Sequence, residues 1–261
     1  MTEQRPASIE MRCVSFSYGK APFLEDLSAS FPSGSVTSVV GPNGCGKSTA
    51  VKLIEGILRP NEGEVLIGGV PTLSLKARQR AQQVAVLAQA VRPPAMTVEQ
   101  LVACGRYPYQ TGQRRLSEHD RHHVEQALDL AGIARLRHCD LRRLSGGERQ
   151  RAFVAMTLAQ DTDTIVLDEP TTYLDIHACH ELMGLVKQLN EEQGKTIVMV
   201  IHDLDLALRY SERLLVMEAG RATSAGTVEE VLASRAIEHA FGVSIHPHET
   251  CEGAAYTLFP A

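Results

Sequence analysis

The sequence lacks several features that mark particular classes of protein. No apolar run approaches the ~18–20 residues that a membrane-spanning helix requires. The six cysteines include no CxxC pair, which is typical of a reducing compartment. The formal net charge is −5, so the cationic excess that non-specific nucleic-acid binding needs is missing. The opening residues MTEQRPASIE contain no apolar signal core, and export is not expected. These absences predict a soluble cytosolic protein that does not act on nucleic acid.

The apolar residues that are present indicate an α/β protein. With 261 residues, 44% of them hydrophobic, the chain is long enough for one large α/β domain or a core with a smaller lobe. The alternating stretch from Ile9 to Tyr18 predicts a strand of an outer antiparallel sheet. Short apolar runs predict core strands at 36–40, 164–167 and 196–201, and 62–69 and 84–88 are further strand candidates. Strands that alternate with helices predict a mostly parallel sheet with helices on both faces.

The middle of the chain has a different pattern. Between 93 and 158 apolar residues recur at helical spacing, as at Val98, Leu101 and Val102. Ten Arg, six Asp or Glu and no Lys lie between Arg106 and Arg151, which fits either a solvated face or a docking surface. We therefore predict a helical subdomain at 93–158, inserted into a core of 1–92 and 159–235. Residues 213–218 with Gly220 predict a hairpin, 228–232 a helix, and 236–261 a tail without predicted structure.

A glycine-rich segment lies between a predicted strand and a predicted helix. It fits the pattern G-x-x-x-x-G-K-[ST] and consists of Gly41, Pro42, Asn43, Gly44, Cys45, Gly46, Lys47 and Ser48. Its glycines allow a tight turn whose N–H groups point at phosphate oxygens, and a helix amino terminus adds a positive dipole end. Lys47 is expected at the β- and γ-phosphates, Ser48 on Mg²⁺, and Thr49 at the α-phosphate. The segment predicts ATP and Mg²⁺ binding. A chance glycine-rich turn is the alternative, but such a turn is not expected to lie between a strand and a helix in this way.

Two acidic residues follow a buried strand. Asp168 and Glu169 come at its carboxyl end, where ligands bind in open α/β sheets. Asp168 can hold the Mg²⁺ shell, and Glu169 can polarise a water aimed at the γ-phosphate. His202, which ends the next strand, can orient that water. Without the phosphate loop, two solvated loop carboxylates and a structural histidine would be the simpler interpretation.

The segment Leu144-Ser-Gly-Gly-Glu-Arg-Gln150 separates the families of phosphate-loop proteins. The segment leads into a predicted helix at 149–158, and it comes just before the strand that is followed by the two acidic residues. In this order and spacing the chain resembles ABC-family ATPase cassettes over nearly its whole length. The resemblance implies a P-loop NTPase (RecA-like) core with an antiparallel β subdomain and an inserted helical subdomain.

The resemblance also implies roles for single residues. Gln89 corresponds to the glutamine that touches Mg²⁺ and water and relays to a membrane subunit. Tyr18 corresponds to the aromatic that stacks on adenine, Asp175 to an aspartate near a dimer seam, and His202 to the switch histidine. In this family two cassettes enclose two ATP molecules head to tail. The chain holds one cassette, so a second subunit would complete each site, and in the simplest case the two subunits form a homodimer. The second subunit would contribute its signature residues Ser145, Gly146 and Gly147.

Two further segments narrow the resemblance. Residues 169–175 and Gly105-Arg-Tyr-Pro-Tyr109 are similar to the ATPases of importers for ferric siderophores, haem and cobalamin. Those ATPases work with an integral membrane permease and, indirectly, a periplasmic or surface substrate-binding protein. The resemblance thus implies a peripheral position on the cytoplasmic face of the inner (plasma) membrane. The main alternative is a soluble ABC ATPase of iron–sulfur cluster assembly. An ABC ATPase that acts on nucleic acid or ribosomes, which usually has two cassettes or long coiled-coil arms, and an exporter are weaker alternatives.

Several histidines and two cysteines allow other interpretations. His246, His248 and Cys251 contain soft metal ligands, but no matching cluster elsewhere supports a metal site. The adjacent His122 and His123 point apart on a predicted helix and form no joint site. Cys45 lies near a helix amino terminus, so a stabilised thiolate and raised reactivity are expected.

Overall fold

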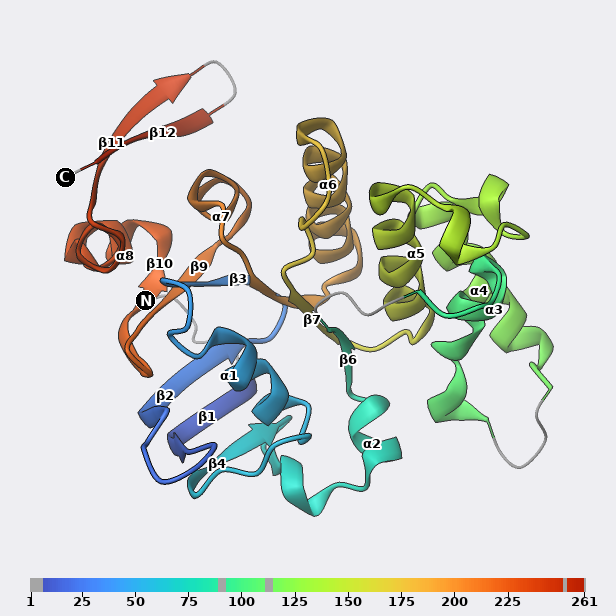
Figure 1. Ribbon diagram of the computed structural model, residues 1–261, viewed down its shortest axis with the longest axis horizontal. Coiled ribbons are helices and arrows are strands. Elements are labelled where there is room, and N and C mark those ends of the chain that lie inside the picture. Colours follow the sequence, from blue (N-terminus) through green and yellow to red (C-terminus); the bar gives the residue numbers. More distant parts are fainter. Residues whose placement is uncertain (1–6, 89–92, 111–114, 251–252, 261) are drawn as a thin grey trace. The chain divides into compact units, whose positions relative to one another are not determined.

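The computed structural model describes residues 7–88, 93–110, 115–250 and 253–260. The chain divides into two compact units. Unit 1 comprises Met1–Leu75 and Thr196–Ala261, and unit 2 comprises Lys76–Lys195. Figure 1 shows the elements of each unit in ribbon form. None of the helices in the described ranges is long and apolar enough to cross a membrane.

Unit 1 contains the predicted antiparallel sheet. Its strands, in the order β2-β1-β4-β5, are β2 (Leu24–Pro32), β1 (Ala7–Phe16), β4 (Glu62–Ile67) and β5 (Val70–Pro71). The buried residues of β1 alternate as Ile9 and Met11, then shift to Val14 and Phe16. The pairing register with β2 shifts between Met11 and Val14, where Cys13 has a left-handed φ of 47°. The bulge keeps the apolar side chains on the buried face despite the break in alternation.

A second sheet region of unit 1 carries the predicted core strands. Its strands are β3 (Val36–Val40), β8 (Thr196–Val200), β9 (Arg213–Glu218) and β10 (Arg221–Thr227). β3 pairs in parallel with both β8 and β9, and β10 returns antiparallel to β9. Every residue of β3 and β8 is buried, as expected of a parallel strand covered on both faces. The predicted hairpin around Gly220 is confirmed.

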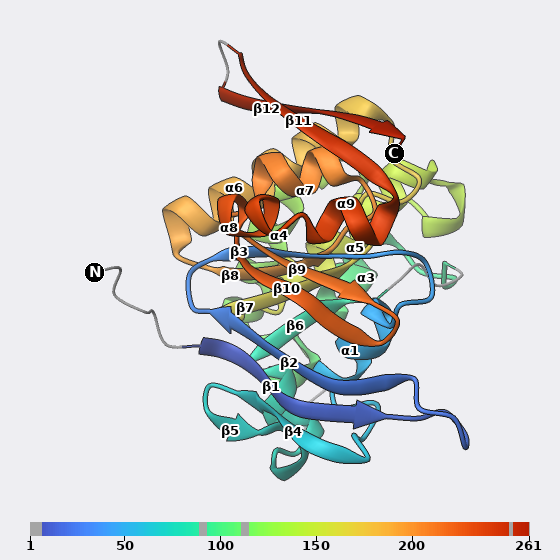
Figure 2. The same ribbon diagram turned by 90° about the vertical axis from the view of Figure 1, so that its left-hand side faces the viewer.

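The helices of unit 1 pack on both of its sheets. They are α1 (Lys47–Ile54), η1 (Thr72–Ser74), α7 (Leu204–Tyr210), α8 (Val228–Ser234) and α9 (Ala236–Phe241). Figure 2 shows α7, α8 and α9 on one side of β3, β9 and β10, with β1, β2 and β4 on the other. The carboxy-terminal residues, for which no structure was predicted, form α9 and a hairpin of β11 (Val243–Thr250) and β12 (Gly253–Pro260).

Unit 2 contains parallel strands and a group of helices. β6 (Val84–Leu87) pairs in parallel with β7 (Thr164–Asp168). The helices are α2 (Ala77–Ala81), α3 (Val98–Cys104), η2 (Tyr107–Tyr109), α4 (Glu118–Leu130), η3 (Ala134–Leu136), η4 (Leu141–Arg143), α5 (Gly146–Ala159) and α6 (Ile176–Gln193). α3, α4 and α5 share one hydrophobic core that includes Val98, Leu128 and Ala155 (Figure 1).

The helices predicted from apolar spacing between 93 and 158 are therefore present and share a core. Unit 2 is larger than the predicted helical subdomain, because it also includes β6, β7 and α6. The subdomain boundaries at 92/93, 158/159 and 235/236 remain predictions.

Candidate functional site

The phosphate loop connects β3 to α1, as predicted. Val40 ends the strand, and α1 starts at Lys47, with Gly46 as its N-cap at a φ of 109°. Glycine is required at two positions of this loop. A Cβ on Gly41 would lie 2.1 Å from the carbonyl oxygen of Met217, and a Cβ on Gly46 would lie 2.4 Å from Leu24 Cδ2. The loop thus packs against β9 and β2 so closely that side chains at these positions would push it out of shape.

The loop holds a buried ammonium group. Lys47 is 5% exposed, and its Nζ donates hydrogen bonds to the carbonyl oxygens of Gly41 at 2.7 Å and Pro42 at 3.0 Å. Among the described residues no carboxylate forms an ion pair with Lys47. A buried cation costs free energy unless an opposite charge compensates it. The loop therefore fits an anionic ligand such as a phosphate chain.

Cys45 is also part of the loop interior. It is 4% exposed, and its Sγ lies 3.9 Å from Lys47 Nζ. Burial raises the pKa of the Cys45 thiol, and the opposing effect of Lys47 does not cancel it. The expectation of a stabilised thiolate is therefore wrong, because desolvation outweighs the nearby positive charge.

An exposed aromatic side chain lies at the start of α1. The hydroxyl of Tyr18 is 3.0 Å from Thr49 Oγ1. The Tyr18 ring is supported edge-on by Phe16 and Phe23, with centroid distances of 4.8 and 5.4 Å. Tyr18 itself is 60% exposed, so a ring face is available to a flat ligand. The structure thus brings Tyr18, which the resemblance alone had suggested, to the end of the phosphate loop.

The acidic pair ends β7 in unit 2. Asp168 is 4% exposed and is the last residue of the strand, whereas Glu169 is half-buried and left-handed, with a φ of 53°. A turn follows, in which the N–H and the hydroxyl of Thr172 donate to the carbonyl and carboxylate oxygens of Glu169 at 3.3 and 3.4 Å. Because the backbone turns sharply between the two acids, the two carboxylates lie in different environments.

The signature segment begins α5 three residues earlier than predicted. Ser145 caps the helix: its hydroxyl accepts from Glu148 N–H at 3.2 Å, and its own N–H donates to Glu148 Oε2 at 3.0 Å. This reciprocal capping box extends the helix to Gly146, so a start at Arg149 is wrong. Hydrogen bonds from Ser145 lower the pKa of Glu148 below its ordinary value.

The turn after the acidic pair packs on this helix start. A Cβ on Gly146 would lie 3.3 Å from Tyr173 Cβ, and one on Gly147 would lie 3.5 Å from Leu174 Cδ2. In addition, Gln150 Nε2 donates to the carbonyl oxygen of Pro170 at 3.0 Å. Within unit 2 the signature segment and the segment after Glu169 therefore form one packed feature. Sequence spacing did not indicate this.

The remaining predicted residues lie near strand or helix ends. His202 follows β8 in unit 1 and is exposed, beside Asp203, which caps α7. Asp175 caps α6 by accepting from Ala178 N–H at 2.8 Å. Gln89 lies outside the described residues. Unit 1 thus carries Tyr18, the phosphate loop and His202, while unit 2 carries the acidic pair and the signature segment.

One buried ion pair was missed by sequence reasoning. Arg106 is 2% exposed, and its Nε donates to Asp120 Oδ1 at 2.9 Å. Its guanidinium also donates to the carbonyl oxygen of Ala159 at 2.8 Å and lies 4.2 Å from the ring centre of Tyr109. The segment at 105–109, noted only for its resemblance, therefore caps the carboxyl end of α5. No local pattern pairs residues 14 positions apart.

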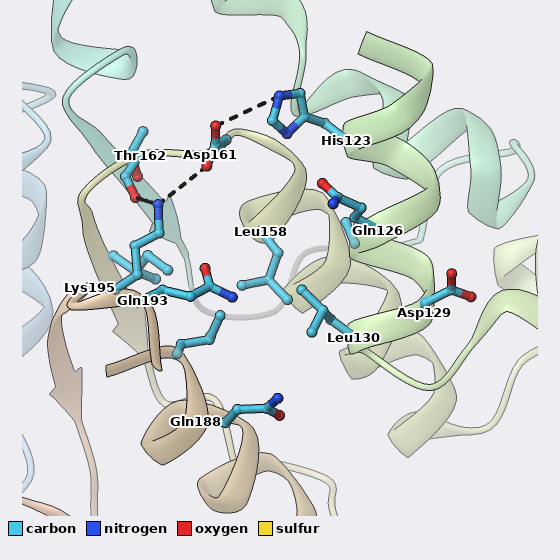
Figure 3. Close-up of a pocket in the computed structure, with 13 residues that line it drawn as sticks. His123, Gln126, Asp129, Leu130, Leu158, Asp161, Thr162, Gln188, Gln193 and Lys195 are labelled. Carbon is cyan, nitrogen blue, oxygen red and sulfur yellow. Dashed lines mark hydrogen bonds and ion pairs between the residues drawn. The ribbon is translucent and has the colours of Figure 1, made fainter. Parts of the chain in front are cut away.

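A cavity of about 660 Å³ lies elsewhere in unit 2 (Figure 3). It is lined by residues of α4, the α5–β7 connection and α6, among them His123, Asp161 and Lys195. No predicted site residue lines it. This cavity is therefore not the place where the phosphate-binding residues gather.

Comparison with known proteins agrees with the motifs. The family described as ABC transporter matches residues 24–172, more than half of the chain. The petrobactin import ATP-binding protein FpuD of Bacillus anthracis is 41% identical over 235 residues, or 90% of this chain and 86% of that protein. The iron(3+)-hydroxamate import ATP-binding protein FhuC of Bacillus subtilis (strain 168) is 39% identical, covering 90% of this chain and 88% of that protein.

Solved structures agree with the fold. The bacterial ABC transporter cassette MJ0796, solved as a dimer, superposes with a TM-score of 0.75 and 28% identity, covering 84% of this chain and 98% of that one. The same cassette has also been solved in a post-hydrolysis state with ADP and Pi, again with a TM-score of 0.75. The predicted P-loop NTPase fold is thereby confirmed. The chain belongs to the ABC transporter family, in which it is an ATP-binding, ATP-hydrolysing cassette.

Proposed function

We propose that this ATPase drives the import of an iron–siderophore-type chelate through a membrane permease. The observation that carries the nucleotide part is the buried Lys47 ammonium, held by loop carbonyls in a glycine-rich turn. The chelate part is supported by the relatives, named for import of petrobactin and of iron(3+)-hydroxamate. Because these relatives are importers, iron–sulfur cluster assembly is not favoured.

In the proposed site, Lys47 and the N–H groups of the loop bind the β- and γ-phosphates, and Thr49 reaches the α-phosphate. Tyr18 offers its exposed ring to adenine. Ser48, Asp168 and Gln89 would hold Mg²⁺, and their oxygens are the hard donors that this ion prefers. When bound, Mg²⁺ neutralises charge on the β- and γ-phosphates.

Hydrolysis is assigned to the second acidic residue. Asp168 is almost fully buried, which suits a fixed charge, whereas the half-buried Glu169 can contact a water. Glu169 accepts a proton from that water while the water attacks the γ-phosphate. His202 orients the water or the phosphate. The left-handed backbone at Glu169 supports this division, because the chain leaves the strand conformation at this residue.

A second copy of the chain completes the site in this proposal. Ser145, Gly146 and Gly147 begin α5, where N–H groups and the positive dipole end favour an anion. They would approach the γ-phosphate held by the other subunit, which excludes water from the open side. We further propose that the dimer lies on the cytoplasmic face of the inner membrane, and that the substrate-binding protein contacts only the permease.

Reconstitution tests the proposal. A permease that purifies with this chain, placed with it in liposomes together with its binding protein, should take up ferric hydroxamate or catecholate only with MgATP. Glu169→Gln should abolish uptake while the complex still assembles. If the chain purifies with a soluble scaffold and with no membrane protein, the transport proposal is wrong and cluster assembly takes its place.

A further inference from the structure

The first two turns of α4 bring two imidazole rings together. His119 and His123 are four residues apart on one helix, and their Nε2 atoms lie 3.1 Å from each other. The rings meet edge to face, with centroids 4.5 Å apart. His122 points elsewhere, and its ring centroid is 6.3 Å from that of His123. The pair that shares a face is thus His119 and His123, not the adjacent histidines.

This separation suits a shared metal ion. Two nitrogens that are each about 2.0–2.1 Å from one ion lie roughly 2.9 Å apart in octahedral geometry and roughly 3.4 Å apart in tetrahedral geometry. The observed 3.1 Å falls between these values. Histidines at i and i+4 of a helix are also the spacing by which helical zinc sites present two ligands. An ion can therefore replace the contact between the rings with little movement of the helix.

The surroundings place a negative charge beside one of the two rings. Asp161 Oδ2 lies 3.7 Å from His123 Nε2, and Figure 3 shows the His123 ring turned toward this carboxylate at the end of the cavity. Burial and the nearby Arg106 guanidinium lower the pKa of His123, although Asp161 acts in the opposite direction. A neutral imidazole can give its lone pair to a metal. The Arg106 guanidinium also opposes a bound cation, and the Asp161 carboxylate offsets this repulsion.

We propose that His119 and His123 chelate a divalent transition-metal ion of the Zn²⁺ class, with Asp161 as the accompanying negative charge. Imidazole favours such ions over Mg²⁺, so the site is distinct in chemistry from the nucleotide site. Over the described ranges no group of three ligands is arranged around one point. Water therefore fills the other positions, and binding is reversible rather than structural.

The proposed metal site is linked through Asp161 to the strand that ends at the acidic pair. Asp161 also pairs with Lys195, whose Nζ lies 3.2 Å from Asp161 Oδ1 and donates to the carbonyl oxygen of Thr162 at 2.9 Å (Figure 3). β7 begins two residues later, at Thr164, and ends at Asp168, next to Glu169. A metal ion bound to His123 would attract the Asp161 carboxylate, which also pairs with Lys195 near the start of this strand.

The test is zinc titration of the full-length, tag-free, nucleotide-free protein by calorimetry, with Co²⁺ absorption as the spectroscopic signature of nitrogen ligation. His119→Gln and His123→Gln should each raise the Kd at least tenfold. Asp161→Asn should raise it less, and His122→Gln, the matched control on the same helix, should leave it unchanged. Circular dichroism establishes that each variant folds.

Binding should also weaken as pH falls, because protons compete for the two imidazoles. Equal zinc affinity in wild type, His119→Gln and His123→Gln would overturn the proposal and place any bound zinc on other residues, such as His246 and His248. A loss in His122→Gln as large as in His123→Gln would overturn it as well.

Discussion

Glu169 combines an acidic side chain with a backbone conformation that L-residues seldom adopt. Its φ of 53° costs on the order of 1–2 kcal/mol relative to the right-handed region. The turn that contains Thr172 and the packing of Pro170 against α5 hold this conformation. Strain of this kind persists where surrounding contacts impose it, and it is concentrated at functional sites.

Replacement of this carboxylate should separate binding from hydrolysis. Glu169→Gln keeps the size and the hydrogen-bonding capacity of the side chain but removes the base. We expect normal ATP binding and a loss of roughly 10²–10⁴ in kcat, the usual scale for a positioned general base. Lys47→Ala is the contrasting variant and should weaken nucleotide binding itself. A Glu169→Gln protein that keeps more than half of wild-type turnover would show that another group accepts the proton.

Cys45 should react slowly with thiol reagents. Its side chain is 4% exposed and burial raises its pKa, so both access and the thiolate fraction are low. The exposed Cys13 should be labelled first, and MgATP should slow labelling of Cys45 further, because the nucleotide covers the loop. Mass spectrometry of a time course with and without MgATP measures both rates.

The control for this labelling is Cys45→Ser, which should retain ATPase activity because the position requires a small side chain rather than sulfur. Identical Cys45 rates with and without nucleotide would mean that the thiol is reached from outside the phosphate-binding face.

At the scale of elements, Arg106 connects three helices of unit 2. It follows α3, pairs with Asp120 in the first turn of α4, and donates to the carbonyl group of Ala159 at the end of α5. Its side chain is 3% exposed and that of Asp120 is 10% exposed. Removal of one partner leaves the other as an uncompensated buried charge.

Arg106→Leu should therefore destabilise the protein by about 3–5 kcal/mol, read from the midpoint of urea unfolding. Arg142→Leu, which breaks the exposed pair with Asp140, is the matched control and should leave the midpoint nearly unchanged. An equal effect of both variants would mean that Arg106 acts only through its apolar stem.

The same pair predicts a pH dependence. Burial alone would raise the pKa of Asp120, but hydrogen bonds from Ser117 and Arg106 lower it below its usual value. A lowered folded-state pKa contributes stability above the unfolded value of about 3.9, and that stability is lost as pH falls through the folded value. Wild type should thus lose stability below about pH 4 more steeply than Asp120→Asn, as measured by urea midpoints across pH. The same pH dependence of the urea midpoint in wild type and Asp120→Asn would contradict a lowered pKa of Asp120.

At the scale of the whole molecule, the proposed site is completed by a second copy of the chain. Glu169→Gln with ATP should accumulate a dimer on size exclusion, because closure no longer ends in hydrolysis. The double variant Glu169→Gln with Lys47→Ala should stay monomeric, since it cannot hold the nucleotide. A dimer that forms equally without ATP would show that the association does not depend on the shared phosphate site.

Coupling to the permease can be tested from a single surface position. Ala95 is exposed and follows the segment that contains Gln89, so we expect the permease to dock near it. Val91, a second position we expect there, lies outside the described residues. A cysteine at 95, in a background without reactive native thiols, should cross-link to a permease loop in membranes. The yield should differ between apo protein and ATP-bound Glu169→Gln. Glu192, exposed on α6, is the comparison site, and equal cross-linking there would mean that the docking surface is elsewhere.

Much of the site could be predicted because its signals are local in the chain. The phosphate loop, the acid pair after β7 and the Ser145 cap each depend on residues that are neighbours in sequence, where turn chemistry and helix capping act. Local pattern also predicted the strands at 36–40 and 213–218. It placed the start of α5 late, because the reciprocal Ser145–Glu148 bonds extend a helix through two glycines that have low helix propensity.

The sequence by itself determined the family, the class of chemistry and the order of the core strands, since these depend on residue types at short spacing. Only the tertiary structure decided which distant residues meet. It paired Arg106 with Asp120 and Ala159, buried Cys45 against Lys47, turned Glu169 left-handed, and set His119 against His123 rather than His122 against His123. The Arg106 contacts and the burial of Cys45 depend on desolvation and packing across elements, which no window of sequence contains.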